Sequence, residues 1–178
     1  MTPEFAQQMA HYNQWMNLRL YEAATQLGTD RLKQNQVAIF GSVFGTLQHL
    51  AVADTIWLLR FATHCGGFAA LADLQNGPRP TALNQQLFEH WADLRAYRQQ
   101  LDAMVVVWSQ DIEPSHLMQP QHYTNTAGVK QCKAFAPLLT HFFNHQTHNR
   151  GQASTLLHQL GVDMGVTDLL ALIPDALD

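Results

Sequence analysis

The chain has 178 residues, 47% of them hydrophobic, and ten Lys and Arg residues against fourteen Asp and Glu residues give it a formal net charge of −4. This length supports one substantial core, so we predict a single domain over residues 1–178. Basic residues form no stripe that could neutralise a run of phosphates, which excludes the usual kind of nucleic-acid-binding protein. Because there is neither a signal peptide nor an apolar run of roughly 20 residues, we expect a cytoplasmic protein without a membrane partner.

Apolar residues at three- and four-residue spacing, separated by Gly and Pro, predict four long helices. These helices are expected at residues 3–27, 42–65, 83–112 and 133–160. Before the last of them, residues 115–131 lose this spacing, and the segment Asn125–Gly128 predicts a turn. Residues 117–118 and 122–124 are expected to pair there as a short hairpin. A final short turn is predicted over residues 167–173.

Four long helices of this kind pack as a bundle. The predicted fold class is therefore all-α, a four-helix bundle with a short irregular or hairpin insertion before the last long helix. The core of such a bundle is also a place where facing helices can bring metal ligands together.

Histidines are concentrated in the last predicted helix, where His141, His145 and His148 lie within eight residues. Residues four apart on a helix lie on one face, about 6 Å from each other, so His141 and His145 can offer two imidazoles to one ion. His148 lies three residues after His145, on a neighbouring face. A third ligand must come from another helix, and His49 is the candidate. We predict a metal site formed by His49, His145 and His141.

Five parts of the sequence carry a resemblance to a known family. The longest and most specific is His141–Gln152. The others are Tyr12–Asn17, Phe40–Ser42 with Gly45–Leu50, Ala53–Leu58 and Leu160–Val162. Together they cover nearly the whole chain, which resembles the DinB family, part of the DinB/YfiT-like group of metal-dependent proteins.

The resemblance implies a bundle, usually dimeric, in which a histidine triad binds a divalent metal. Relatives in the wider group include mycothiol-dependent maleylpyruvate isomerase and bacillithiol transferases, in which the metal is thought to activate a low-molecular-weight thiol. The classical DinB members are known as damage-inducible proteins without an assigned reaction. For this chain we therefore expect a homodimer that uses zinc or nickel, with a low-molecular-weight thiol as a second cofactor, on a small-molecule substrate that the sequence does not identify.

One position departs from the family pattern. Family members typically read His-His-Arg-Gly-Gln at the end of the long motif, which puts the ligand pair on the positions of His145 and Asn149 here. An amide oxygen is a poorer zinc ligand than imidazole. Either His141 or His148 substitutes, water fills the position, or the site has lost affinity. His141 is favoured because it keeps the four-residue spacing to His145.

Other residues of the resembling segments have a structural interpretation beside the functional one. Asp54 lies on a different face of its helix from His49, and we expect it to bond a polar group of the first helix such as Asn13 or Asn17. Arg150 is either paired or solvated, or it binds substrate. The four tryptophans lie at helical spacing and are expected in the core, at positions 15, 57, 91 and 108.

Three neutral imidazoles with an open position would lower the pKa of a bound water or hold a thiol as its thiolate. The predicted function is therefore a divalent-metal-dependent enzyme, either a thiol-dependent S-transferase or a hydrolase. The alternative is a non-catalytic, stress- or damage-related bundle whose metal site is weakened by Asn149.

Overall fold

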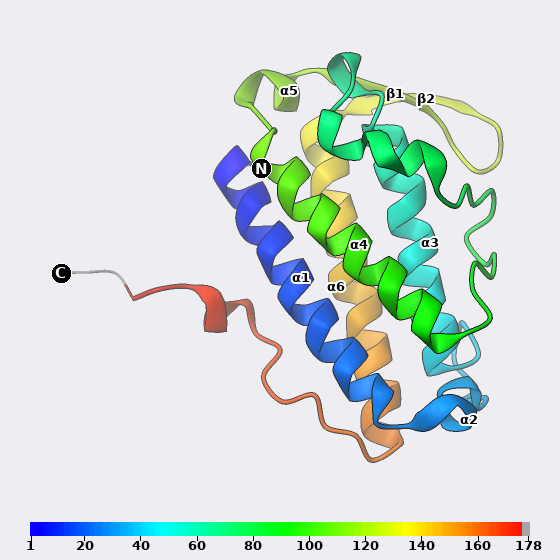
Figure 1. Ribbon diagram of the computed structural model, residues 1–178. Coiled ribbons are helices and arrows are strands. Elements are labelled where there is room, and N and C mark those ends of the chain that lie inside the picture. Colours follow the sequence, from blue (N-terminus) through cyan, green and yellow to red (C-terminus); the bar gives the residue numbers. More distant parts are fainter. Residues whose placement is uncertain (176–178) are drawn as a thin grey trace.

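The structure is a computed structural model, and it describes residues 1–175. Four long helices form a bundle (Figure 1): α1 Pro3–Thr25, α3 Val43–Phe61, α4 Trp91–Gln110 and α6 Phe135–Gln159. Helix α1 packs against α4 and α6, and α3 packs against the same two helices from the other side. The pair α1 and α4 therefore lies opposite the pair α3 and α6. This arrangement confirms the predicted all-α bundle.

Two of the long helices begin at side-chain caps. The Thr2 hydroxyl accepts a hydrogen bond from the Phe5 N–H at the start of α1, and the Ser42 hydroxyl accepts one from the Gly45 N–H at the start of α3. Each bond satisfies a backbone donor that the first turn of a helix leaves free. A Cβ at Gly45 would overlap the carbonyl oxygen of Phe40, so only glycine permits the chain to fold back so tightly before α3.

The predicted helix over residues 83–112 begins later than expected. Residues 83–90 are irregular, and α4 starts at Trp91. The reason is tertiary: Gln48 on α3 bonds the N–H of Leu87 and the carbonyl of Phe88, which gives this backbone partners outside any helix. Between α3 and α4 the chain also forms two short 3-10 helices, η1 His64–Gly66 and η2 Ala69–Asn76.

Smaller elements connect the long helices. The first helix ends at Thr25, and a short helix follows that the sequence did not predict, α2 Gly28–Lys33. Helix α5 Pro114–Met118 precedes a hairpin of β1 Pro120–Thr124 and β2 Lys130–Ala134, which pair antiparallel. The expected pairing of residues 117–118 was wrong, because they belong to α5. The predicted turn is confirmed, and the Asn125 side chain accepts bonds from the N–H groups of Ala127 and Val129.

The chain returns from the end of α6 along the outside of α1 (Figure 1). We call residues 161–175 the C-terminal strap; it contains the 3-10 helix η3 Leu169–Leu172, where a short turn was predicted. The Tyr12 hydroxyl donates to the Thr167 carbonyl, and Arg19 donates to the Met164 carbonyl. These two bonds attach the strap to α1.

One continuous hydrophobic core fills the bundle. Trp108 is completely buried in it, as predicted, whereas Trp15, Trp57 and Trp91 are half-buried and pack against its edge. The indole N–H of Trp91 donates to the Thr25 hydroxyl. Among the helices of residues 1–175, none is both long enough and apolar enough to cross a membrane.

Candidate metal centre

The structure brings His49 of α3 and His145 of α6 together, although 96 positions separate them in the sequence. Their Nε2 atoms lie 3.2 Å apart. His49 is only 7% exposed, and His145 is half-buried. Two facing helices of the bundle thus contribute one imidazole each to the same point.

The ring of His49 is held from two directions. Its Nδ1 lies 3.0 Å from the carbonyl oxygen of Leu83, and its ring stacks on Phe40 with 3.9 Å between the ring centroids. A carbonyl can only accept, so Nδ1 carries the proton and donates it to Leu83. The Nε2 of neutral His49 therefore presents its lone pair to His145. Metal-binding histidines are commonly oriented by the same kind of bond to a backbone carbonyl.

The Nε2 of His145 has a second neighbour, the Asn149 side chain. The Asn149 Nδ2 lies 3.1 Å from that Nε2, and it also donates to the His145 carbonyl oxygen at 2.9 Å. An amide nitrogen is a donor only, so His145 Nε2 accepts and has its lone pair on this side. Neither Nε2 atom then carries a proton, so two acceptor nitrogens face each other, an arrangement that a cation between them would stabilise.

Both imidazoles are neutral at neutral pH. Burial lowers the pKa of His49, against the opposing effects of the Leu83 carbonyl and the Asp54 carboxylate. Burial also lowers the pKa of His145 to about 4, with further contributions from His49, His141 and His148. The neutral imidazole is the form that binds a metal ion.

The other two histidines of the long motif lie at different places. His141 is next to His145, with 6.1 Å between ring centroids, and its ring packs edge-on against Trp57 at 5.2 Å. His148 is exposed, and its Nε2 lies 2.9 Å from the Gln152 amide. Within residues 1–175, no three His, Cys, Asp or Glu side chains are placed to hold one ion together. The role of His141 as a third ligand stays a prediction.

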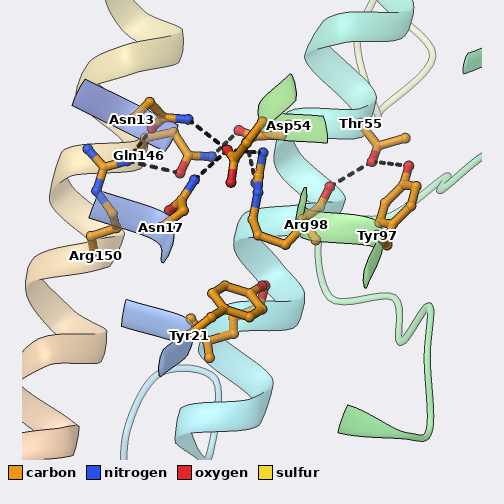
Figure 2. Close-up of polar contacts among 12 residues, drawn as sticks. Asn13, Asn17, Tyr21, Asp54, Thr55, Tyr97, Arg98, Gln146 and Arg150 are labelled. Atoms are coloured by element: carbon orange, nitrogen blue, oxygen red, sulfur yellow. Dashed lines mark hydrogen bonds and ion pairs between the residues drawn. The ribbon is translucent and has the colours of Figure 1, made fainter. Parts of the chain in front are cut away.

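A buried polar network lies beside the histidine pair and joins all four long helices (Figure 2). Asp54 of α3 pairs with Arg98 of α4 at 2.6 Å and accepts a bond from Gln146 of α6. Arg98 also pairs with Asp102 at 2.9 Å, and Asp102 accepts a bond from Asn17 of α1 at 2.8 Å. The expectation that Asp54 bonds Asn13 or Asn17 was wrong: those asparagines contact Asp102, and the partners of Asp54 are Arg98 and Gln146.

Arg150 belongs to the same network. It is 2% exposed, donates to Asn13, and packs over the ring of Tyr12. Burial lowers its pKa to about 10, so it keeps its charge at neutral pH. This position favours the paired interpretation of Arg150 over a substrate-binding one, because the guanidinium has no free path to a molecule in solution.

A cavity of about 480 Å³ borders His49 on the side of Leu83. Its wall combines aromatic and polar side chains, among them Phe40, Phe44, Gln48 and Lys33. A volume of this size lies within the range of small-molecule sites, roughly 300–1,000 Å³. His49 therefore has a space beside it that a small substrate could occupy, whereas His145 is not part of the cavity wall.

The comparisons with known proteins agree with this architecture. The sequence profile of the DinB family matches residues 1–175. The chain is similar to Protein DinB of Bacillus subtilis (strain 168), with 24% identity over 169 residues that cover 93% of this chain and 91% of the relative. No solved structure gives a significant match. Because the family profile covers almost the whole sequence, the chain belongs to the DinB family.

Proposed function

We propose that this protein is a metal-dependent enzyme of the DinB type that binds one divalent ion, zinc or nickel, between His49 and His145. The observation that supports it is the pair of facing Nε2 atoms, 3.2 Å apart. Two nitrogens bound to one tetrahedral zinc ion at about 2.0–2.1 Å lie roughly 3.3 Å from each other. The distance between the two nitrogens therefore matches such an ion.

The third ligand position has two candidates on α6. His141 keeps the four-residue spacing to His145 and would have to rotate away from Trp57. Asn149 is already beside His145 Nε2, but it would have to turn its amide so that Oδ1 replaces Nδ2, with loss of the bond to the His145 carbonyl. We favour His141, because imidazole is the better ligand for zinc and nickel.

Such an ion would supply a Lewis acid that lowers the pKa of a thiol or a water near the open coordination position. The protein's own contribution is orientation. The Leu83 carbonyl fixes the His49 tautomer, and Phe40 fixes the plane of its ring. The cavity on the Leu83 side of His49 is large enough for a small thiol. We therefore propose thiol transfer or hydrolysis as the reaction class.

A second candidate function has its own supporting observation. Asn149 presents an N–H donor to His145, so a hydrogen bond occupies the imidazole lone pair that a metal would use. A non-catalytic, stress-related bundle would tolerate this arrangement.

Zinc binding separates the two candidates. His49→Ala and His145→Ala should each weaken zinc binding at least about tenfold in equilibrium dialysis of the untagged protein, because either change removes one ligand. His148→Ala is the matched control, since its imidazole faces Gln152 on the surface. Undiminished zinc binding in both alanine variants would overturn the proposal, and a chain that binds no zinc would favour the non-catalytic bundle.

A further inference from the structure

A second cavity lies on the opposite side of the bundle from the histidine pair, between α1 and α4. Its volume is about 420 Å³. Its apolar wall consists of Trp15, Leu18 and Tyr21 from α1, and Leu172 of the C-terminal strap contributes the remaining apolar side chain. The strap thus helps to enclose a space of the size that small molecules occupy, roughly 300–1,000 Å³.

The same cavity is also lined by charged and polar residues of the buried network. Asn17, Arg98 and Asp102 are 1%, 2% and 4% exposed. Every contact to the Asp102 carboxylate within residues 1–175 involves Oδ1, from Asn13 at 3.5 Å, Asn17 at 2.8 Å and Arg98 at 2.9 Å. The Oδ2 atom keeps its lone pairs for another donor. The Oδ1 atom of Asn17 also has no hydrogen-bond partner among residues 1–175.

Asp102 is the one carboxylate of the network that lines the cavity. One guanidinium, that of Arg98, serves two carboxylates, Asp54 and Asp102. The second buried guanidinium, Arg150, bonds the neutral side chains of Asn13 and Gln146. The charge of Arg150 also acts on both carboxylates, so the two guanidiniums balance them, and Asp102 is the carboxylate that faces the cavity. Burial raises the pKa of Asp102 to about 6, so this carboxyl is ionised at neutral pH, and a buried carboxylate gains from a close cation.

We propose that the cavity binds a small aromatic amine, with its ring between Trp15, Tyr21 and Leu172 and its ammonium group at Asp102 Oδ2. Trp91 already stacks on one face of Tyr21, and Arg19 lies over one face of Trp15, so the part of each aromatic side chain that lines the cavity is what a planar ring would contact. Arg95 also lines the cavity but is partly exposed, so water screens its charge from the ammonium group. This site is independent of the metal centre, because its residues come from α1, α4 and the strap.

Tryptamine and tryptophol are a matched pair of probes, because they share the indole ring and differ in an ammonium or a hydroxyl at the end of the same side chain. Isothermal titration of the full chain at pH 7.5 should show tryptamine binding about tenfold or more tightly than tryptophol, since a charge-assisted bond to a buried carboxylate is the stronger one. Asp102→Asn should remove this preference. Equal affinity of the two probes, or no binding of tryptamine, would overturn the proposal.

Two further variants test the location. Leu18 is 45% exposed, so Leu18→Trp should fill the cavity without disturbing the core, and it should abolish tryptamine binding. Leu170→Trp is the control, because Leu170 is 74% exposed and lies outside the cavity wall. His145→Ala should bind tryptamine like the parent. Binding that survives Leu18→Trp, or that is lost with His145→Ala, would place the amine elsewhere and refute the site.

Discussion

Replacing Asn149 by histidine tests the third ligand position of the proposed metal centre. The Asn149 Nδ2 atom lies 3.1 Å from His145 Nε2, and the residue is 3% exposed, so a side chain at this position ends beside the histidine pair. An imidazole in place of an amide donor contributes about 1–3 kcal/mol to zinc binding, which is about one to two decades in Kd. The lost bond from Asn149 to the His145 carbonyl costs roughly 1 kcal/mol of folding stability. Zinc affinity should therefore rise although the metal-free protein becomes slightly less stable.

Competition against a chromophoric chelator resolves a tenfold change in zinc Kd. The Asn149→His variant should bind tighter than the parent, and His141→Ala in that background should then have little effect, because the new imidazole completes the site. In the parent, His141→Ala should weaken binding if His141 is the native third ligand. A variant Asn149→His that binds zinc no tighter than the parent would show that this position does not face the ion.

Three other predictions concern pH, the buried ion pairs and assembly. The pKa of His145 is about 4 in the folded chain and 6.5, the ordinary value for histidine, in the unfolded chain. Between these pH values the unfolded chain binds a proton at His145 and the folded chain does not. The free energy of unfolding should therefore fall as the pH falls from 6.5 to 4. His145→Gln should flatten the corresponding fall in melting temperature, and identical pH profiles would contradict this. Arg98→Met should lower the free energy of unfolding, measured in urea, by about 3–5 kcal/mol, since it leaves two buried carboxylates without their cation. A decrease below about 1 kcal/mol would be inconsistent with the pairing. Light scattering should give a mass twice that of the 20.1 kDa chain. The double variant Phe5→Asp, Val107→Asp should be monomeric, because these apolar residues of α1 and α4 are 43% and 52% exposed and could form the contact between two chains. A parent protein that is already monomeric would refute the dimer.

The four long helices could be predicted from the sequence because each has an apolar face with regular spacing, which depends only on local residues. The start of α4 could not. Leu83, Leu87 and Phe88 continue the apolar pattern, yet their backbone bonds side chains of α3: His49 contacts the Leu83 carbonyl, and Gln48 bonds both other residues. Such long-range bonds leave no trace in the local spacing.

The pairing of His49 with His145 could be anticipated from the histidine positions and the family resemblance. The direction of the Asn149 amide could not, because it depends on a bond to the backbone of its own helix. The buried network had a signal that sequence reasoning missed. Arg98 and Asp102 are four residues apart and fall within the apolar face that Leu94, Leu101 and Val105 define on α4, where charged residues are rarely unpaired.

Helix α6 explains why the histidine pair and the network occur together. His145 and Asn149 are four residues apart and share the face toward α3, whereas Gln146 and Arg150 follow each of them by one residue and share the neighbouring face toward the network. Asp54 accepts a bond from Gln146, so a rotation of α6 about its axis would break a buried hydrogen bond to a carboxylate. Losing a hydrogen bond to a charged group costs about 1.5–3 kcal/mol. The network thus fixes the rotation of α6, and with it the direction in which His145 presents its lone pair to His49.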